Sequence, residues 1–270
     1  MSEYEFLKGH GTENDFVLLL DPDGPVHGDL SPERVRALCD RRAGIGGDGV
    51  LRVVRNAADD AWFMDYRNAD GSISEMCGNG VRVFAHFLLT EGHVAPGEPI
   101  PVDTRDGVKT VTVDGDLYTV DMGTPKPLGQ TTVGANGINW PARHVDMGNP
   151  HAVAFVGASL AIVGDLAQVP AHDPGLYPDG VNVEFVTRLG ERHVAMRVHE
   201  RGSGETRSCG TGACAVMVAA ALADGTHTPG THTTYRVDVP GGTLAVTWTA
   251  DDRVLLTGPA VLVARGTTDL

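Results

Sequence analysis

Two cysteine residues in this sequence stand in nearly identical settings. Cys77 lies in MCGNGVRVF (76–84) and Cys209 in SCGTGACAV (208–216), and each begins a Cys-Gly-x-Gly turn before an apolar stretch. A helix that starts at such a turn exposes backbone N–H groups and a partial positive charge. The glycines allow a ligand to approach those N–H groups closely. The pattern predicts two binding sites for an anion such as a carboxylate, each with a thiol beside it.

The same helix ends are expected to make both thiols reactive. A free cysteine has a pKa of about 8.5, and a helix N-terminus lowers it. The dipole contributes about 0.3–1 kcal/mol, or about 2 kcal/mol where it is partly buried, which corresponds to roughly one pKa unit. We therefore predict that Cys77 and Cys209 populate the thiolate near neutral pH. Cys39 and Cys214 have apolar neighbours and are interpreted as small core residues.

The two turns belong to an internal repeat. A polar residue closes a strand before each cysteine, Asp-Gly-Val precedes that strand, and an asparagine beside a glycine-bearing turn comes earlier still. The matching positions are Asn68 and Glu200, 48–50 and 179–181, and Asn14 and Asn149. The repeat predicts two homologous lobes related by an approximate two-fold axis. We place the first lobe at residues 1–122 plus about 257–270, the second at 123–256, and the active site in the cleft between them.

Two such lobes would bring one thiol to each side of a single substrate. One thiolate can remove a proton while the opposing thiol returns a proton to the other face, which inverts a stereocentre. The N–H groups that hold a carboxylate would then stabilise the enediolate-like transition state, where preorganised donors contribute most. The pattern therefore indicates a two-base racemase or epimerase.

The elements that must position these residues alternate along the chain. Residues with β-branched and alternating patterns predict strands, and three stretches with helical periodicity predict helices. The expected strands are 16–20, 49–55, 61–67, 108–115, 117–123, 151–157, 181–188, 193–200 and 243–249, and the expected helices are 31–42, 80–92 and 212–225. Ser31 is expected as the N-cap of the first helix with Pro32 at its first position. The fold class is therefore α/β, of the α+β type.

Polar residues near the two turns fit an amino-acid substrate. Glu200 and Arg201 follow the strand that leads to Cys209, and Asn14, Asn68, Asn149 and Asn182 lie at strand ends or turns. A single turn asparagine is usually turn chemistry, and only the placement in matching halves favours binding. His151 either assists proton transfer or fills a core position, and the sequence leaves both open.

Composition excludes several classes of protein. The 270 residues carry a net charge of −14, so neither nucleic acid nor an anionic membrane is an expected partner. Four cysteines do not make a disulfide scaffold, and 35 glycines without a Gly-X-Y period do not make collagen. No apolar run reaches the length of a membrane span, and the first residues lack the charge and apolar pattern of a secretory signal. A cytoplasmic location is expected.

Three weaker signals are set aside. The string 44–49 fits G-x-G-x-x-G, but it follows a helix and leads into a strand, the reverse of a dinucleotide site. The spacing of Cys209 and Cys214 does not match a zinc site. None of the three lysines lies in a repeated motif, which argues against a pyridoxal Schiff base. No metal and no cofactor are expected.

The chain resembles diaminopimelate epimerase over nearly its whole length. The matching strings are HGTENDF (10–16), AGIGGDGV (43–50), NADGSISEMCGNGVR (68–82), MGNPH (147–151), NVEF (182–185), ERGSGETRSCGTGACA (200–215) and PGGTLAVTW (240–248). The resemblance implies a cofactor-independent enzyme that interconverts LL- and meso-diaminopimelate, in lysine and peptidoglycan precursor synthesis. It also implies two similar lobes, each a mixed, mostly antiparallel sheet around a central helix, and a homodimer.

The resemblance assigns roles to individual residues. It implies Cys77 and Cys209 as the acid–base pair, with His151 and Glu200 assisting them. The residues that match the family's substrate contacts are Asn14, Asn68, Asn149, Asn182, Glu200 and Arg201, together with the backbone groups of Gly78, Asn79, Gly210 and Thr211.

Some positions depart from common forms of the family. Glu13 stands where glycine is frequent, which puts the shape of the first loop in question. Proline racemase-like enzymes share the paired cysteines but resemble MCGH at the first turn, whereas this chain has MCGNG. Phenazine-biosynthesis relatives lack the cysteine pair. A two-lobed amino-acid-binding module without chemistry stays open as a different class.

Overall fold

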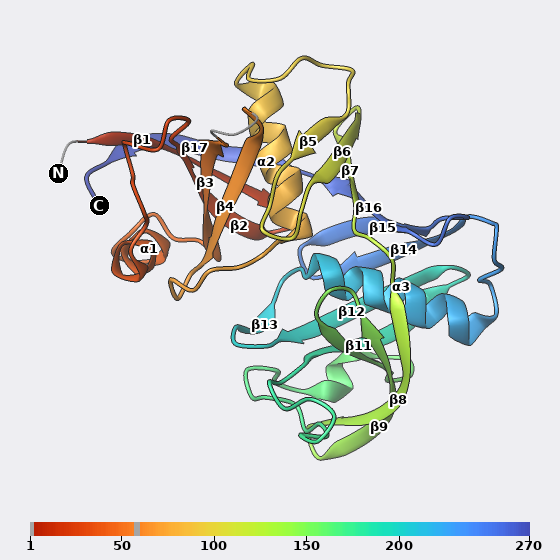
Figure 1. The fold of residues 1–270 in the computed structure, drawn as a ribbon. Helices are drawn as coiled ribbons and strands as arrows, with labels where there is room; N and C mark the ends of the chain where they lie inside the picture. The colour runs from red at the N-terminus through yellow and green to blue at the C-terminus, as the bar shows by residue number, and fades with distance from the viewer. Residues whose placement is uncertain (1–2, 57–59) are drawn as a thin grey trace. The chain divides into compact units, whose positions relative to one another are not determined.

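A computed structural model describes residues 3–56 and 60–270, and the chain divides into two compact units. Unit 1 comprises Met1–Val120 and Gly258–Leu270, and unit 2 comprises Asp121–Thr257. The end of the chain therefore belongs to the same unit as its beginning. Figure 1 shows this directly, because the final strand, β17, runs beside β1.

Unit 1 contains a five-stranded sheet and a smaller set of three strands. The sheet order is β17 (Val261–Thr268), β1 (Tyr4–Gly11), β2 (Asn14–Leu20), β3 (Gly49–Arg55) and β4 (Trp62–Asn68). Among the described residues of this sheet, β2 and β3 pair in parallel and the other neighbouring strands pair antiparallel. The remaining strands are β5 (Ile100–Val102), β6 (Lys109–Asp114) and β7 (Leu117–Asp121), and the helices are α1 (Pro32–Cys39) and α2 (Gly78–Thr90).

Unit 2 repeats this order of strands. The sheet runs β8 (Lys126–Ala135), β9 (Ile138–Asp146), β10 (Pro150–Phe155), β11 (Asn182–Gly190), β12 (His193–Glu200), β14 (Thr233–Val239), β15 (Gly242–Trp248) and β16 (Val254–Pro259). The short β13 (Gly204–Thr206) pairs with β12, and η1 (Leu160–Val163) is a 3₁₀ turn. The parallel pair β10–β11 corresponds to β2–β3, and α3 (Gly210–Asp224) corresponds to α2. The repeat is therefore present in the topology.

Each long helix is buried against the strands of its own unit. The helix α2 contacts β1–β6 and β17, and α3 contacts β9–β12, β14 and β15. Every residue from Gly212 to Ala221 is buried, which explains why α3 is apolar on all sides. The predicted fold class, with a mixed sheet around a central helix in each unit, is confirmed.

The sequence placed most elements correctly and missed several strands. Ser31 caps α1 and Pro32 is at its first position, as predicted. The helices α2 and α3 begin two residues earlier than expected, because Cys77 and Cys209 themselves are the N-caps. The strands that were not predicted are β1, β5, β8, β9, β13, β14, β16 and β17. Within the described residues, no helix has the length and apolar character needed to cross a membrane.

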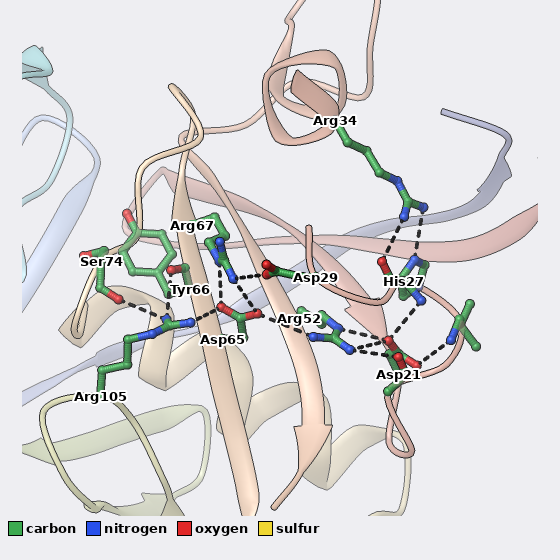
Figure 2. Close-up of polar contacts among 12 residues, drawn as sticks. Asp21, His27, Asp29, Arg34, Arg52, Asp65, Tyr66, Arg67, Ser74 and Arg105 are labelled. Atoms are coloured by element: carbon green, nitrogen blue, oxygen red, sulfur yellow. Dashed lines mark hydrogen bonds and ion pairs between the residues drawn. The ribbon is translucent and has the colours of Figure 1, made fainter. Parts of the chain in front are cut away.

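A network of ion pairs lies in unit 1, on the strands β3 and β4 and the loops beside them (Figure 2). Asp21 is fully buried and binds Arg52 at 2.8 Å, while Asp65 binds Arg67 at 2.8 Å and also contacts Arg105. These arginines hold the pKa of both carboxyls below the ordinary range, although burial opposes the shift. His27 is 6% exposed, and burial together with Arg34 lowers its pKa to about 4.

Candidate active site

The first cluster of predicted residues lies at the start of α2 in unit 1. The Cys77 Sγ accepts a hydrogen bond from the Gly80 N–H at 3.4 Å, so the thiol caps the helix. The same Sγ lies 3.6 Å from the Asn14 Oδ1, which also accepts from the Asn79 amide at 3.2 Å. Asn79 is fully buried and is held in turn by Arg82 at 2.6 Å. The structure therefore brings Asn14, Cys77 and Asn79 together.

Charged residues that were not predicted as site residues orient the Asn14 side chain. Its Nδ2 donates to the Asp48 carboxylate at 2.8 Å, and Asp48 binds Arg41 at 2.7 Å. Since Nδ2 is held by a carboxylate, Oδ1 must face Cys77. In the sequence, Asp48 was noted only as part of the repeated Asp-Gly-Val. The signal that could have identified it is its position as a charged residue directly before a buried strand.

The loop before Asn14 keeps a tight shape without glycine. Thr12 and Glu13 both have positive φ angles, of 50° and 60°, in the two-residue turn between β1 and β2. Two positive φ values are typical of the type I′ hairpin, which explains why glycine is frequent here in the family that the chain resembles. The Glu13 N–H donates to the His10 ring at 3.2 Å.

Asn68 is at the end of β4, where the repeat placed it, but its amide is engaged within its own turn. Its Nδ2 donates to the Ser72 Oγ at 2.9 Å, and its backbone N–H donates to the Ser72 carbonyl at 2.9 Å. The half-buried side chain therefore stabilises the turn that precedes Cys77 in this structure.

The second cluster lies at the start of α3 in unit 2. The Cys209 Sγ accepts from the Gly212 N–H at 3.4 Å and lies 3.5 Å from the Thr211 hydroxyl. Its thiol also interacts with the Glu200 carboxyl, which accepts a hydrogen bond from the Thr206 hydroxyl. Cys209 thus repeats the capping role of Cys77 and adds a direct contact with an acidic side chain.

The prediction of a lowered thiol pKa is wrong for Cys209. Burial raises its pKa well above the ordinary value, and the charges of Glu200 and Glu184 raise it further. The hydrogen bonds from Thr211 and from the helix N-terminus at Gly212 oppose this shift but do not reverse it. The thiol is therefore the stable form of Cys209 near neutral pH. Burial also raises the pKa of the Glu200 carboxyl.

His151 is fully buried at the start of β10 and has a polar partner on each ring nitrogen. Its Nδ1 lies 2.6 Å from the Glu184 Oε1, and its Nε2 lies 2.9 Å from the Asn149 Oδ1. The Asn149 amide then donates to the Thr211 hydroxyl at 3.5 Å. The sequence left open whether His151 fills a core position or assists proton transfer. In the structure it is buried, and it is also connected to the cluster around Cys209 through Asn149. Glu184 was not predicted as a site residue.

Asn182 and Arg201 form the rim of this cluster. The buried Asn182 accepts from the Arg201 backbone N–H at 2.9 Å and donates to the Pro150 carbonyl at 3.2 Å. Its amide therefore ties the starts of β10 and β11 to the turn after β12. The Arg201 side chain is exposed and lies 3.5 Å from the Asp179 carbonyl.

The remaining cysteines are core residues, as predicted. Cys39 is 6% exposed, Cys214 is fully buried, and all four cysteines are reduced. Burial raises the pKa of Cys39 to about 12, so this thiol is inert. In the part of the chain that the structure describes, no three His, Cys, Asp or Glu side chains are grouped as a metal site.

Each cluster can therefore combine acid–base chemistry with anion binding. A helix N-terminus directs its first N–H groups outward, and these can hold a carboxylate beside the capping thiol. Gly78 and Gly210 are the first residues of the two helices, and both are buried. A thiol next to a bound carboxylate is positioned to exchange a proton with the carbon that bears the carboxylate.

Comparisons with known proteins agree on one family. The diaminopimelate epimerase family model matches residues 6–128 and 143–263. A diaminopimelate epimerase from Streptomyces coelicolor is 60% identical, with 98% of this chain and 95% of that protein covered. A diaminopimelate epimerase from Corynebacterium glutamicum is 48% identical, with 97% and 96% covered.

Solved structures with the same fold are more distant in sequence. A phenazine biosynthesis protein of the PhzF family from Bacillus anthracis has a TM-score of 0.75 at 15% identity, with all of both chains covered. A hydroxyproline epimerase from Agrobacterium vitis has a TM-score of 0.66 at 17% identity, with 98% of this chain and 92% of that chain covered. At these identities the likeness concerns the fold alone.

Proposed function

The chain belongs to the diaminopimelate epimerase family, and from this premise we propose that it interconverts LL- and meso-2,6-diaminopimelate. The reaction serves the synthesis of lysine and of peptidoglycan precursors. The observation that carries the proposal is the pair of helices capped by Cys77 and Cys209, each with its thiol 3.4 Å from the third helical N–H. The substrate has two ammonium and two carboxylate groups, so its net charge is zero and the acidic chain does not repel it.

The proposed mechanism uses the two thiols on opposite faces of one α-carbon. Cys77 as thiolate removes the α-proton of the LL isomer, and the thiol of Cys209 donates its proton to the other face. The roles exchange in the reverse direction. Proton and charge balance, because one thiolate becomes a thiol and one thiol becomes a thiolate. The raised pKa of Cys209 supports its role as the donor to the LL-derived carbanion.

The surrounding residues have proposed roles in holding the substrate. The N–H groups at Gly78, Asn79, Gly210 and Thr211 stabilise the carboxylate as it gains enediolate character. The side chains proposed to contact the substrate are Asn14, Asn68, Asn149, Asn182, Glu200 and Arg201. His151 and Glu200 assist the thiols. One chain supplies both thiols from its two units, and the active protein is a homodimer.

Hydrogen exchange tests the proposed function directly. The purified, reduced protein is incubated with LL-diaminopimelate in D₂O, and the α-proton signal is followed by NMR. We expect deuterium at the α-carbon together with formation of the meso isomer. Binding without exchange would instead support the amino-acid-binding module, which needs no acid–base pair.

The cysteine variants separate the two thiols that act from those that only pack. Cys77→Ala and Cys209→Ala should each abolish epimerisation while the protein stays folded. Cys214→Ala is the matched control, because this cysteine lies fully buried in the same helix that Cys209 caps. Turnover retained in either of the first two variants would refute the two-base mechanism.

A further inference from the structure

Glu184 and His151 form a pair with no solvent exposure in the interior of unit 2. An amide oxygen only accepts hydrogen bonds, so the His151 Nε2 that faces the Asn149 Oδ1 carries a proton. A second proton lies in the 2.6 Å contact between the His151 Nδ1 and the Glu184 Oε1. The two side chains therefore share this proton in a short, fully buried hydrogen bond.

The equivalent place in unit 1 can be found from the strand register. Phe16 follows Asn14 by two residues, as His151 follows Asn149. Phe16 pairs with Gly49 across the parallel strands β2 and β3, and His151 pairs with Asn182 across β10 and β11. Phe16 is thus the counterpart of His151.

In unit 1 the positions equivalent to His151 and Glu184 are occupied by two apolar residues, Phe16 and Leu51. Two residues beyond Gly49 on β3 stands Leu51, and two residues beyond Asn182 on β11 stands Glu184. The helices confirm the correspondence. A Cβ built on Gly80 would lie 3.4 Å from Leu51 and 3.6 Å from Phe16, whereas one on Gly212 would lie 2.7 Å from the Glu184 Oε1.

Packing alone does not require a polar pair at this position. Replacing a buried ion pair by apolar residues of similar volume is often neutral or stabilising, and unit 1 shows that phenylalanine and leucine fit beneath such a helix. The Glu184 Oε2 is buried without a hydrogen-bond partner among the described residues, which adds a desolvation cost. The Glu184–His151 pair as a whole is therefore not required for the stability of the core.

The contacts of the pair lead to the reactive thiol. The His151 Nε2 holds the Asn149 Oδ1, which leaves the Asn149 Nδ2 to donate to the Thr211 hydroxyl at 3.5 Å. That hydroxyl lies 3.5 Å from the Cys209 Sγ. If the His151 ring were rotated, the Asn149 amide would lose this hydrogen bond and would no longer be held toward Thr211.

We propose that Glu184 is a positioning residue for the epimerisation: its carboxyl group fixes the His151 ring, and the ring orients Asn149 toward Thr211 beside Cys209. The proposal rests on the proposed function, since it assigns Glu184 a part in that reaction. The charge of Glu184 raises the pKa of the Cys209 thiol, and its positioning effect acts through the hydrogen bond to His151.

A double-mutant cycle tests this dependence. The variants are Glu184→Leu, His151→Phe and the two together, which installs the apolar pair of unit 1. We expect Glu184→Leu alone to lower kcat/KM by about 10- to 100-fold, because small misplacements near the reacting groups have effects of this size. In the His151→Phe background the same change should have a much smaller effect, because the ring that Glu184 orients is gone and only the effect of its charge on Cys209 remains.

Stability gives a readout that separates positioning from packing. Glu184→Leu alone should lower the unfolding midpoint, because it leaves the buried His151 Nδ1 without a partner. The double variant should recover the midpoint of the wild type or exceed it, yet stay as inactive as His151→Phe. Stability regained without activity is the result that a merely structural role would not produce.

Glu184→Gln provides the conservative rescue and a spectroscopic check. The glutamine amide keeps a hydrogen bond to the His151 Nδ1, so most of the activity should return. Nitrogen-15 NMR of the His151 ring should show the Nε2 proton protected from exchange in the wild type and in Glu184→Gln, and unprotected in Glu184→Leu.

Two results would overturn the proposal. One is an equal loss of kcat/KM on Glu184→Leu with and without His151, and the other is wild-type kcat/KM in Glu184→Leu. If Glu184→Leu does not fold, the test is the comparison of kcat/KM between the double variant and His151→Phe. An inactive wild type would instead refute the proposed function, and the ring signals would still report whether Glu184 holds His151.

Discussion

At the residue scale, Cys77 and Cys209 receive the same hydrogen bond from the third N–H of their helix, but Cys209 also has two glutamates as neighbours. Negative charge next to a thiol disfavours the thiolate, and burial acts in the same direction. A two-base reaction needs one thiol and one thiolate at the start of each turnover. The acidic surroundings of Cys209 favour the protonated form on that side.

Glu200→Gln should make Cys209 more reactive. The substitution removes a negative charge that raises the pKa of Cys209 and keeps a polar side chain of the same size, so the pKa of Cys209 should fall. Below the pKa, each unit of decrease raises the thiolate fraction tenfold, and a neighbouring charge typically shifts a pKa by about one unit or more. We therefore expect about tenfold faster alkylation of Cys209 by iodoacetamide at pH 8, measured by mass spectrometry of its peptide.

Glu191→Gln is the control for general charge effects. Glu191 is an exposed residue next to β12, and its loss should leave the rate of Cys209 alkylation unchanged. An unchanged rate in Glu200→Gln would mean that burial alone sets the pKa of Cys209. A rate that rises in both variants would point to the net charge of the chain.

The sequence predicted which residues would gather in each cluster better than it predicted their electrostatics. The repeat located Cys209 and Glu200, and in the structure the Glu200 carboxylate affects the pKa of the Cys209 thiol. The sequence could not give the sign of the Cys209 pKa shift. The effect of the helix dipole follows from local sequence, whereas burial and the charge of Glu184 depend on how other strands pack around the thiol. Glu184 itself was missed, although an acidic residue inside the buried strand 182–187 is a signal that could have revealed it.

At the element scale, α2 and α3 start with the same cap but differ in the space around the third residue. A Cβ on Gly80 would meet no heavy atom closer than 3.4 Å, which is ordinary van der Waals contact. A Cβ on Gly212 would meet the Glu184 Oε1 at 2.7 Å and the Cys209 side chain at 3.2 Å. Position 212 of α3 therefore has no room for a methyl group unless its neighbours shift, whereas position 80 of α2 does.

Gly212→Ala and Gly80→Ala should have opposite effects on stability. Overpacking at residue 212 should destabilise α3 by about 1–3 kcal/mol. The alanine at residue 80 should be neutral or should stabilise α2 by up to about 1 kcal/mol, because glycine is a poor helix former. Hydrogen–deuterium exchange resolves the two helices separately, so each variant should change protection in its own helix.

The pair of glycine variants is its own control, because both substitutions add the same methyl group at the same helical position. Equal protection of α3 in the wild type and Gly212→Ala would show that Glu184 can move away without cost. A loss of protection in α2 on Gly80→Ala would contradict the space that the structure gives to that position.

Elements with strong local patterns were predictable, and those that depend on their partners were not. The strand 49–55 and the strand 193–200 have the bounds that their apolar runs predict. The strand β8 was missed because KPLGQTTVGA starts with five exposed residues and contains proline and two glycines. Its pairing with β9 makes it a strand, and pairing between segments leaves little trace in the sequence of one of them.

At the scale of the whole molecule, the stability of unit 1 should depend on pH through His27. The folded protein holds the pKa of His27 near 4, whereas the unfolded chain has the ordinary value of 6.5. Between these values the unfolded state binds a proton that the folded state does not, so stability falls as the pH falls. The full loss is about 3 kcal/mol, since one pKa unit corresponds to about 1.36 kcal/mol.

His27→Gln should remove this contribution. Denaturant titrations at intervals from pH 7 to pH 4.5 should show a shallower loss of stability in the variant than in the wild type. Trp62 is buried in β4 of unit 1 and contributes to the fluorescence signal together with Trp140 and Trp248 of unit 2. Asp21 and Asp65 have lowered pKa values, so their contributions are lost only at lower pH and do not enter this window. Parallel pH profiles would contradict the assignment to His27.

The division into two units leads to a prediction about how many chains build one active site. Each unit folds around its own helix and presents one capping cysteine, so a chain that lacks one thiol can still remove a proton but cannot return one to the opposite face. If both thiols of a site come from one chain, Cys77→Ala and Cys209→Ala chains cannot complement each other.

Co-expression of the two variants in one cell tests this. We expect the mixed preparation to show no more epimerisation than the separate variants. A two-fold dimer with sites shared between chains would behave differently: half of the dimers would be mixed, and each mixed dimer would hold one complete site of two, so about a quarter of the wild-type activity would return. Recovery at that level would show that the two cysteines of a site belong to different chains. Unit 2 of one chain would then complete the active site of the other chain.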